Sequence, residues 1–240
     1  MRRFGIIGYP LGHSFSPPYF ANKFQELGIE DSEYKAYPIT SIKDFPSLIT
    51  DDLVGLNVTI PYKEAVIPYM DELSDAARKI KAVNTIFQKD GKLIGHNTDY
   101  YGFMKSLIDL IDGEDVKAAL VLGTGGSSKA VCYALSAMGI SYSLVSRNPD
   151  YLSYSDLTED VIKKHQLIIN TTPLGMSPHI HASPLINFIY LNDQHFCYDL
   201  IYNPEKTLFL EKAEQHGATI KNGHDMLILQ AEKSWQIWNQ

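Results

Sequence analysis

The first hundred residues combine short apolar runs with a segment of helical apolar spacing. We predict an amphipathic helix at about Pro18–Leu27. Its apolar residues Phe20, Phe24 and Leu27 recur every three or four positions and therefore share one face. Short apolar runs on both sides of this helix predict strands. Because strands and helix alternate, parallel pairing is favoured, and the predicted strands are Phe4–Gly8, Glu33–Tyr37 and Val54–Thr59.

One predicted pair of strands departs from this alternation. Val83–Gln88 and Lys92–Asn97 flank Asp90-Gly91, a strong signal for a tight hairpin turn. An antiparallel excursion is therefore expected in an otherwise parallel sheet. A long helical pattern at Tyr100–Ile111 follows and links the two halves of the chain.

The second half returns to alternating strands and helices. Its last predicted element is a helix that ends close to the C-terminus. The predicted strands are Ala118–Leu122, Tyr142–Ser146, Leu167–Asn170, Phe196–Leu200 and Ala218–Lys221, and the helices are Ser128–Met138 and His224–Trp238.

This order predicts an α/β fold built from two α/β domains. Residues 1–100 would form a mostly parallel sheet, and residues 101–222 a Rossmann-like domain. Residues 223–240 would form a C-terminal helix that returns to pack on the first domain. The sequence has no internal repeat, low-complexity tract or flexible linker.

The composition excludes several classes of protein. A net charge of −7, without a basic stripe, argues against nucleic-acid or acidic-membrane partners. Few apolar residues precede Pro10, so the N-terminus is a first strand and not a signal peptide. No apolar run is long enough to span a bilayer. Cys132 and Cys197 are expected to be reduced packing residues of a cytoplasmic protein. The protein is expected to be a monomer or a homodimer.

A glycine turn between the strand at residues 118–122 and the following helix is the first candidate site. Gly123, Gly125 and Gly126 allow a tight turn and a close approach of the backbone to a ligand. Strand, turn and helix in this order leave backbone N–H groups and a positive helix end free for a pyrophosphate. Ser128 stands where a dinucleotide fingerprint has Gly or Ala, and its side chain is small enough for close packing.

The end of the next strand specifies the cofactor as NADP. Arg147 stands between Ser146 and Asn148, where an NAD site has an acid for the ribose 2′-hydroxyl. A guanidinium offers paired donors to a 2′-phosphate, and Lys129 adds a second positive charge. The alternative is an ordinary solvated arginine in a loop. Residues 170–176 follow another strand at the same edge of the sheet, where ligands bind in such folds.

In the first half, a loop with two hydroxyls suits a small carboxylate. Ser14 and Ser16 precede the first helix, whose N-terminus favours negative charge. The alternative is that Ser16 caps the helix ahead of Pro17.

Lys63 is the candidate acid/base. It follows an apolar strand and Pro61, so its ammonium is expected to be only partly solvated. The alternative is an ordinary surface lysine at the start of a helix. Asn84 lies near the start of the hairpin, and Asp99 closes it. If Lys63 and Asp99 meet, each holds the other in place, although Asp99 could equally be the N-cap of the linking helix.

Together these residues resemble shikimate dehydrogenase over essentially the whole chain. The matching segments keep the family's order, and their combination is highly specific. They are residues 12–17 (GHSFSP), 57–63 (NVTIPYK), 82–85 (AVNT), 97–99 (NTD), 123–129 (GTGGSSK), 170–173 (NTTP), 199–204 (DLIYNP) and 223–230 (GHDMLILQ).

The resemblance implies reversible reduction of 3-dehydroshikimate to shikimate with NADPH, in aromatic amino-acid biosynthesis. Lys63 would be the acid/base, supported by Asp99. The substrate residues would be Ser14, Ser16, Thr59, Lys63, Asn84, Asp99, Tyr202 and Gln230. The cofactor residues would be Gly123, Thr124, Gly125, Gly126, Ser127, Ser128, Lys129, Ser146, Arg147, Asn148, Thr171, Leu200, Gly223 and Met226.

One motif departs from the family pattern. The family's glycine turn more often reads Gly-Ala-Gly-Gly-Ala, followed by a small residue and Arg. Here Lys129 stands in place of that arginine. Lysine keeps the charge and loses the paired donors, so weaker phosphate binding is expected.

Three alternatives stand beside this interpretation. A quinate/shikimate dehydrogenase using NAD is disfavoured by Arg147. A non-catalytic sensor of shikimate-like acids or NADP is disfavoured because binding alone needs neither Lys63 nor Asp99. A metal enzyme is suggested only by His179 and His181, which lack acidic or cysteine partners at ligand spacing.

Overall fold

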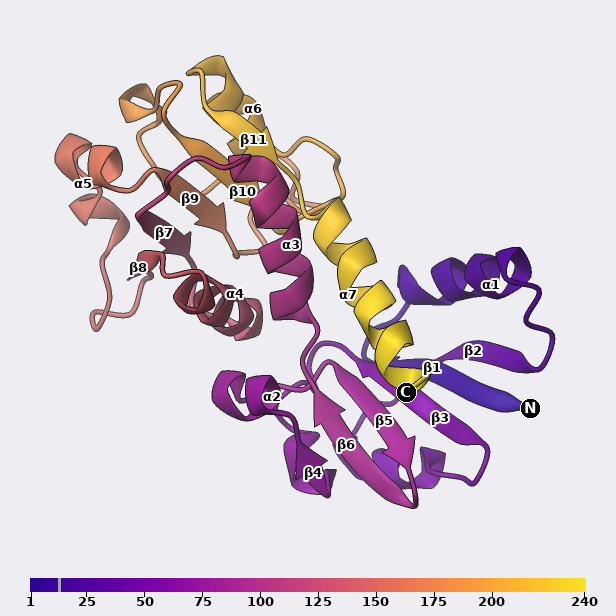
Figure 1. The fold of residues 1–240 in the computed structure, drawn as a ribbon. Coiled ribbons are helices and arrows are strands. Elements are labelled where there is room, and N and C mark those ends of the chain that lie inside the picture. Colours follow the sequence, from indigo (N-terminus) through magenta and orange to yellow (C-terminus); the bar gives the residue numbers. More distant parts are fainter. Residues whose placement is uncertain (13) are drawn as a thin grey trace. The chain divides into compact units, whose positions relative to one another are not determined.

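The structure is a computed structural model that describes residues 1–12 and 14–240. His13, part of the 12–17 motif, lies outside the described residues. The described chain divides into two compact units (Figure 1). Unit 1 comprises Met1–Thr98 and Ala231–Gln240, and unit 2 comprises Asp99–Gln230. The expected C-terminal segment, residues 223–240, is therefore divided between the units.

Unit 1 is built on a mixed sheet with the strand order β2-β1-β3-β5-β6-β4. β1 pairs in parallel with β2 and β3, and β4 in parallel with β6. The predicted hairpin forms the antiparallel part, in which β5 pairs with β3 and β6. The strands are β1 Arg2–Gly8, β2 Ser32–Pro38, β3 Leu53–Val58, β4 Glu72–Leu73, β5 Thr85–Lys89 and β6 Lys92–His96.

Both faces of this sheet are covered by apolar clusters. An aromatic cluster on one face includes Phe4, Phe20 and Trp238, and it joins α1 (Ser16–Glu26) and the end of α7 (His224–Trp238) to the strands. The cluster on the other face includes Leu56, Val66 and Ala77. It is closed by the 3₁₀ helices η1 (Ile42–Leu48) and η2 (Ile67–Tyr69) and by α2 (Asp75–Ile80).

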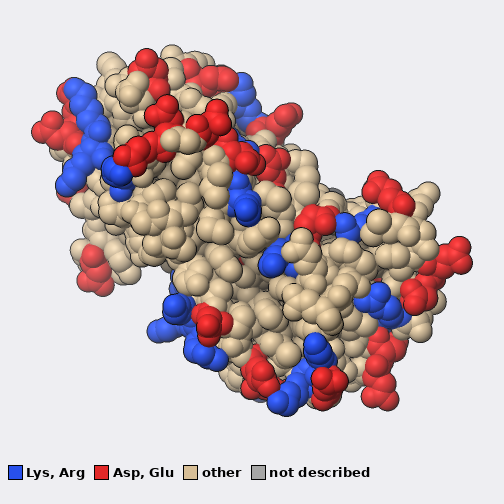
Figure 2. All heavy atoms as spheres, in the orientation of Figure 1, with Lys and Arg blue, Asp and Glu red and all other residues tan. Residues whose placement is uncertain are grey.

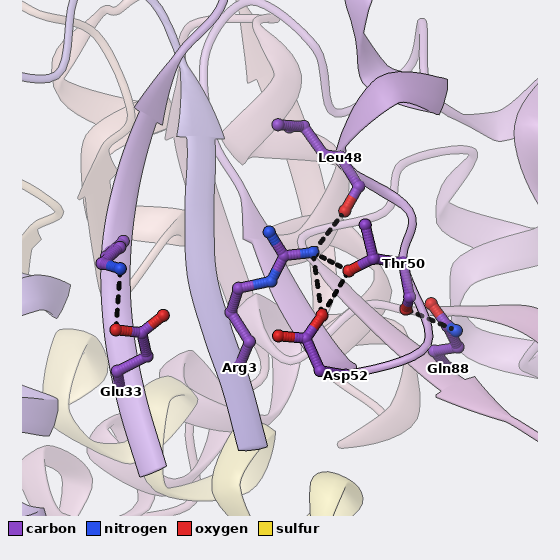
Figure 3. A network of polar contacts seen from close by, with 7 residues as sticks. Arg3, Glu33, Leu48, Thr50, Asp52 and Gln88 are labelled. Carbon is purple, nitrogen blue, oxygen red and sulfur yellow. Dashed lines mark hydrogen bonds and ion pairs between the residues drawn. The ribbon is translucent and has the colours of Figure 1, made fainter. Parts of the chain in front are cut away.

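The amino-terminal edge of the sheet holds a separate polar network (Figure 3). The Arg3 guanidinium donates to the Leu48 carbonyl oxygen at 2.9 Å and to the Thr50 hydroxyl, and it pairs with Asp52 at 3.5 Å. Gln88 donates to the Thr50 carbonyl oxygen at 3.1 Å. These contacts tie the loop before β3 to β1 and β5. They lie at the end of the parallel strands opposite to the loops that carry Ser14 and Lys63.

Unit 2 is a parallel sheet with the strand order β11-β10-β9-β7-β8. Helices α3 and α4 pack on one face, and α5 and α6 on the other (Figure 1). The strands are β7 Ala118–Leu122, β8 Ser141–Val145, β9 Leu167–Asn170, β10 Phe196–Asp199 and β11 Thr219–Lys221. The helices are α3 Asp99–Ile111, α4 Gly126–Ala137, η3 Tyr154–Asp156, α5 Glu159–Lys164, η4 Phe188–Tyr190 and α6 Leu208–Gln215.

This arrangement confirms the predicted α/β fold with two mostly parallel sheets. Every predicted strand and helix is present within a few residues of its expected bounds. Elements that were not predicted are short and include β4, α2, α5 and α6.

Three further features of the described residues bear on the expectations from composition: the surface charge, the cysteines and the character of the helices. On the face shown in Figure 2, basic side chains of the described residues lie among acidic ones, without a broad basic area on that face. Cys132 and Cys197 are both free thiols, and burial raises the pKa of Cys132 to about 11. In residues 1–12 and 14–240, none of the helices combines the length and the apolar character that a membrane crossing requires.

Candidate functional site

In unit 1, the loops that follow β1 and β3 are tied to each other. Thr59 N–H donates to the Ile7 carbonyl oxygen at 2.9 Å, and Tyr9 N–H donates to the Ile60 carbonyl oxygen at 3.0 Å. Gly8 permits this close approach, because a Cβ atom there would lie 2.4 Å from Thr59 Cγ2. The segment carrying Ser14 and Ser16 and the segment carrying Thr59 and Lys63 therefore leave the same edge of the sheet.

Ser14 and Ser16 differ in their surroundings. The Ser14 hydroxyl donates to the Leu11 carbonyl oxygen at 3.1 Å. Ser16 is buried and hydrogen-bonds the hydroxyl of Tyr34, whose own pKa is raised by burial. Ser16 is also the first residue of α1, and Phe15 holds the N-cap position, so the interpretation of Ser16 as the cap is wrong.

The start of α1 offers fewer backbone N–H groups than an ordinary helix N-terminus. Pro17 and Pro18 lack N–H groups and occupy the second and third helical positions. An anion at this end therefore gains fewer backbone donors than at an ordinary helix N-terminus. Carboxylate binding here would depend on the side chains of Ser14 and Ser16.

Lys63 and Asn84 are held close together by the backbone. The Lys63 carbonyl oxygen accepts from Val83 N–H at 2.7 Å, and the Asn84 carbonyl oxygen accepts from Val58 N–H at 2.8 Å. The Lys63 side chain is half-buried. Antiparallel pairing of β3 with β5 places Asn84, directly before β5, beside the end of β3. Unit 1 thus gathers Thr59, Lys63 and Asn84 at one edge.

Asn84 is fixed by a buried polar network that the sequence analysis did not identify. Its Oδ1 accepts from Thr98 N–H at 2.6 Å, and its Nδ2 donates to Thr98 Oγ1 at 2.9 Å. Ser234 Oγ lies 2.7 Å from Thr85 Oγ1 and accepts from Asn57 Nδ2 at 3.1 Å. The sequence feature that could have indicated this network is the presence of polar side chains within otherwise apolar strands.

In unit 2, the glycine turn forms an open cradle at the start of α4. Gly123 has φ +105°, and a Cβ atom there would lie 2.8 Å from Thr171 Oγ1. A side chain at this position is therefore disfavoured both by the backbone conformation and by the lack of space. Gly125 is the N-cap of α4. A Cβ atom at Gly125 or Gly126 would meet nothing within 4 Å. The N-terminus of α4 has no side-chain cap, and the open space in front of it fits a phosphate.

Residues around this turn have distinct roles. Ser128 is buried, and its hydroxyl donates to the Gly125 carbonyl oxygen at 2.6 Å, so it shapes the turn. Ser127 and Lys129 are partly exposed on the first turn of α4. Thr124 Oγ1 lies 3.3 Å from Ser146 Oγ, which brings the loop after β8 next to the cradle.

That loop presents Arg147 to solvent. Ser146 Oγ accepts from Asn148 N–H at 3.1 Å, and Asn148 Oδ1 accepts from Asp150 N–H at 3.1 Å. These short-range bonds define the backbone on both sides of the exposed Arg147. Arg147 thus lies exposed in the loop that follows β8, the strand that neighbours β7.

The ends of β9 and β10 carry the remaining predicted cofactor residues. Thr171 Oγ1 donates to the Leu122 carbonyl oxygen at 2.7 Å, which joins the loop after β9 to the glycine turn. Leu200 N–H donates to the Asn170 carbonyl oxygen at 3.0 Å. Gly223 packs directly on Leu200, because a Cβ atom there would lie 2.1 Å from the Leu200 carbonyl oxygen.

Met226 and Gln230 lie on α7, where it packs against α3. A Cβ atom on Gly102 would lie 2.5 Å from the Met226 carbonyl oxygen and 3.0 Å from Gln230 N, so only glycine allows this approach. Gln230 is buried and its Nε2 donates to the Leu227 carbonyl oxygen at 2.8 Å. Asp99, also buried, is the first residue of α3, one turn before Gly102.

The two candidate catalytic residues belong to different units. Lys63 lies in unit 1, whereas Asp99 lies in unit 2, as do Tyr202 and Gln230. The pairing of Lys63 with Asp99 therefore stays a prediction. Within residues 1–12 and 14–240, no group of three or more His, Cys, Asp or Glu side chains is placed to hold a metal ion.

Comparison with known proteins identifies relatives along the whole chain. Residues 6–86 match the family described as the shikimate dehydrogenase substrate binding domain. A curated relative from Caldicellulosiruptor bescii, "Shikimate dehydrogenase (NADP(+))", is 39% identical, with 99% of this chain and 89% of the relative covered.

Solved structures give the same result. Shikimate 5-dehydrogenase from Thermus thermophilus, in complex with NADP(H) and shikimate, is 32% identical, with a TM-score of 0.87 over 99% of this chain and 93% of the other. Quinate dehydrogenase from Corynebacterium glutamicum, in complex with NAD, is 26% identical, with a TM-score of 0.89 over 99% and 93%. The agreement of sequence over nearly the full chain, and not of fold alone, shows that this protein belongs to the shikimate dehydrogenase family.

Proposed function

We propose that the protein is an NADP-dependent shikimate dehydrogenase, which reversibly reduces 3-dehydroshikimate to shikimate in aromatic amino-acid biosynthesis. The observation that carries this proposal is the similarity, over almost the whole chain, to curated relatives with that name. The relative from Thermus thermophilus has a solved structure in complex with NADP(H) and shikimate. Arg147, exposed where an NAD site has an acid, supports NADP.

Unit 1 would bind most of the substrate. Ser14 and Ser16 would hold the carboxylate, because the prolines of α1 leave their hydroxyls as important donors. Thr59 and Asn84 would hold ring hydroxyls from the edge where β3 and β5 meet. Asp99, Tyr202 and Gln230 would complete the set from unit 2.

Unit 2 would bind the cofactor, which supplies a hydride to the carbonyl carbon of the substrate. The cradle at residues 123–129 would hold the pyrophosphate, and Arg147 with Lys129 the 2′-phosphate. Ser146, Asn148 and Thr171 would shape the adenosine side. The nicotinamide pocket would be lined by Leu200, Gly223 and Met226. Two of these residues, Leu200 and Gly223, are in direct backbone contact.

Lys63 would supply the proton. As the carbonyl carbon gains the hydride, its oxygen becomes negative, and the Lys63 ammonium donates a proton to that oxygen. In the oxidation direction, neutral Lys63 takes the same proton from the hydroxyl. Asp99 would orient the ammonium and stabilise its charged form. The polar environment of Asn84 would keep the ring at a fixed position during transfer.

A steady-state assay of the purified protein tests this function. Shikimate with NADP⁺ should give a rise in NADPH absorbance, and quinate or NAD⁺ should give a much lower kcat/KM. Equal efficiency with NAD⁺ would contradict the role of Arg147. Binding of shikimate without turnover would support the sensor alternative. A cytoplasmic location and a monomeric or homodimeric state remain predictions.

A further inference from the structure

Asp199 is a buried carboxylate that has none of the substrate, cofactor or proton-transfer roles proposed above. It is the last residue of β10 and has no exposed surface. Its Oδ1 accepts from Ile201 N–H at 3.0 Å and from Asn170 Nδ2 at 3.1 Å. Its Oδ2 accepts from Thr207 Oγ1 at 2.6 Å. One side chain therefore collects donors from three segments of unit 2.

Each partner of Asp199 begins or shapes a loop at the carboxyl edge of the sheet. Asn170 Oδ1 accepts from Thr172 N–H at 3.0 Å and so sets the turn after β9. Thr207 is the N-cap of α6. The bond from Ile201 N–H closes a turn around Leu200, whose carbonyl group faces Gly223 from the other side. Leu200 and Ile201, directly before Tyr202, are thus held between the carboxylate and Gly223.

This arrangement is costly for the fold. Burial raises the pKa of Asp199 to about 6, and its partners within the described residues are neutral donors, without an ion pair. A neutral side chain would avoid the penalty of burying a charge. Perturbed carboxyl groups of this kind cluster at functional sites.

We propose that Asp199 is a positioning residue, which fixes the loop of Leu200 and Tyr202 against the loop after β9. The inference rests on the proposed function, in which Leu200 lines the nicotinamide pocket and Tyr202 lies near the substrate carboxylate. Asp199 itself touches neither ligand. Its role is to hold reacting groups at a distance at which hydride transfer is fast, because small misplacements there lower kcat strongly.

Two substitutions at this position separate hydrogen bonding from side-chain volume. Asp199→Ala leaves the donors of Ile201, Asn170 and Thr207 without an acceptor. We expect kcat to fall by about tenfold to a hundredfold, with the KM for NADP⁺ changed less than about threefold, since the phosphate cradle is untouched. Asp199→Asn keeps an acceptor for Ile201 and a polar partner for Thr207, so kcat should stay within about threefold.

A matched control tests whether a loss of stability alone could explain a lower kcat. Ile162→Ala opens a cavity in the core of the same unit, at a buried position on α5, a helix that carries none of the hydrogen-bond partners of Asp199. It should lower the melting temperature at least as much as Asp199→Ala, while kcat at a temperature where both are folded stays within about threefold. Equal loss of kcat in both variants would overturn the proposal.

Hydrogen exchange decides the inference independently of turnover. Asp199→Ala should accelerate exchange at the Ile201 amide by at least about tenfold, and Ile162→Ala should not. Unchanged exchange at Ile201 would overturn the positioning role even in an active enzyme. Inactivity of the wild-type protein with shikimate and NADP⁺ would instead contradict the proposed function, with exchange at Ile201 still reporting on the loop.

Discussion

Lys63 is the residue on which the proposed chemistry depends most directly. It is half-buried at the edge of unit 1, and its backbone is tied to Val83 at 2.7 Å. We predict that Lys63→Ala lowers kcat by about a hundredfold or more, because the reacting oxygen loses its proton donor. The affinity for shikimate should change only modestly. Steady-state kinetics together with calorimetric titration of shikimate measure both quantities.

The control for this substitution removes a lysine that lies outside the proposed site. Lys79, on α2, is exposed in the same unit, so Lys79→Ala should retain normal kcat and KM. Near-normal turnover of Lys63→Ala would assign proton transfer to another group.

Arg147 is the residue that we propose selects NADP over NAD. Arg147→Ala should raise the KM for NADP⁺ about tenfold or more and leave the KM for NAD⁺ almost unchanged, because only NADP⁺ carries the 2′-phosphate. Lys129→Ala should have a smaller effect, since an ammonium lacks the paired donors of a guanidinium. Parallel assays with both cofactors check this, and an equal rise in both KM values would mean that Arg147 does not recognise the 2′-phosphate.

Asp199 gives the free energy of unfolding a defined pH dependence. Its pKa is about 6 in the folded protein, above the ordinary value of 3.8, because burial disfavours the charge. The folded state therefore binds more protons than the unfolded state between these values, and stability falls as pH rises through 6, by about 3 kcal/mol in total. Asp199→Asn lacks this titration. Urea unfolding at about pH 4.5 and about pH 7.5 should show the Asn variant gaining relative to wild type at the higher pH.

At this scale, some properties of the residues were predictable and others were not. The open cradle after β7 was predictable from the glycine turn, because the conformation of a turn depends on the few consecutive residues that form it. Ser16 was open to a capping interpretation because sequence alone does not fix which residue precedes the first helical turn. Asn57 and Ser234 are 177 residues apart, and their hydrogen bond follows only from the tertiary fold.

Among the elements, the contact of the loop after β10 with the start of α7 is the most constrained. Gly223→Ala would place a Cβ atom 2.1 Å from the Leu200 carbonyl oxygen, so the loop must move. We expect a loss of about 1–3 kcal/mol in stability and a clear fall in kcat. Thermal unfolding and kinetics measure the two effects.

A second glycine provides the control for that substitution. Gly139 has φ +74° at the end of α4, and a Cβ atom there meets nothing within 4 Å. Gly139→Ala should cost about 1–2 kcal/mol through backbone strain and leave kcat unchanged. A normal kcat for Gly223→Ala would show that its contact with Leu200 is not needed for catalysis.

Element prediction succeeded where periodicity extends over several residues. β7 and β9 have the expected bounds because they are continuous apolar runs in a parallel sheet. β4 has only two residues, and α2 and α5 have six each, which is too short for a helical or alternating pattern to stand out. α6 is amphipathic, but its eight residues follow a loop rich in turn residues that obscures its start.

At the scale of the whole molecule, α7 is the element that both units share. It begins in unit 2 and its last residues belong to unit 1, where the Trp238 indole donates to the Ile86 carbonyl oxygen at 2.9 Å. Gly55 makes room for this indole, since a Cβ atom there would lie 2.0 Å from Trp238 Nε1. The return of this helix to the first domain was expected from the order of elements along the chain, although no local pattern encodes the distant contact of Trp238 with Ile86.

The assignment of substrate to unit 1 and cofactor to unit 2 leads to a prediction about ligand protection. A ligand that binds only the folded state suppresses local opening of the segments it contacts, by an amount that grows with its concentration above Kd. NADP⁺ alone should therefore slow amide exchange in residues 123–129 and 146–148. Shikimate alone should slow exchange in residues 59–63 and at Asn84. Hydrogen-exchange mass spectrometry with each ligand measures both patterns, and wild-type protein with NAD⁺ should show weaker protection at residues 146–148, because NAD⁺ lacks the 2′-phosphate. Protection of residues 59–63 by NADP⁺ alone, with none at 123–129, would reverse the assignment of the two units.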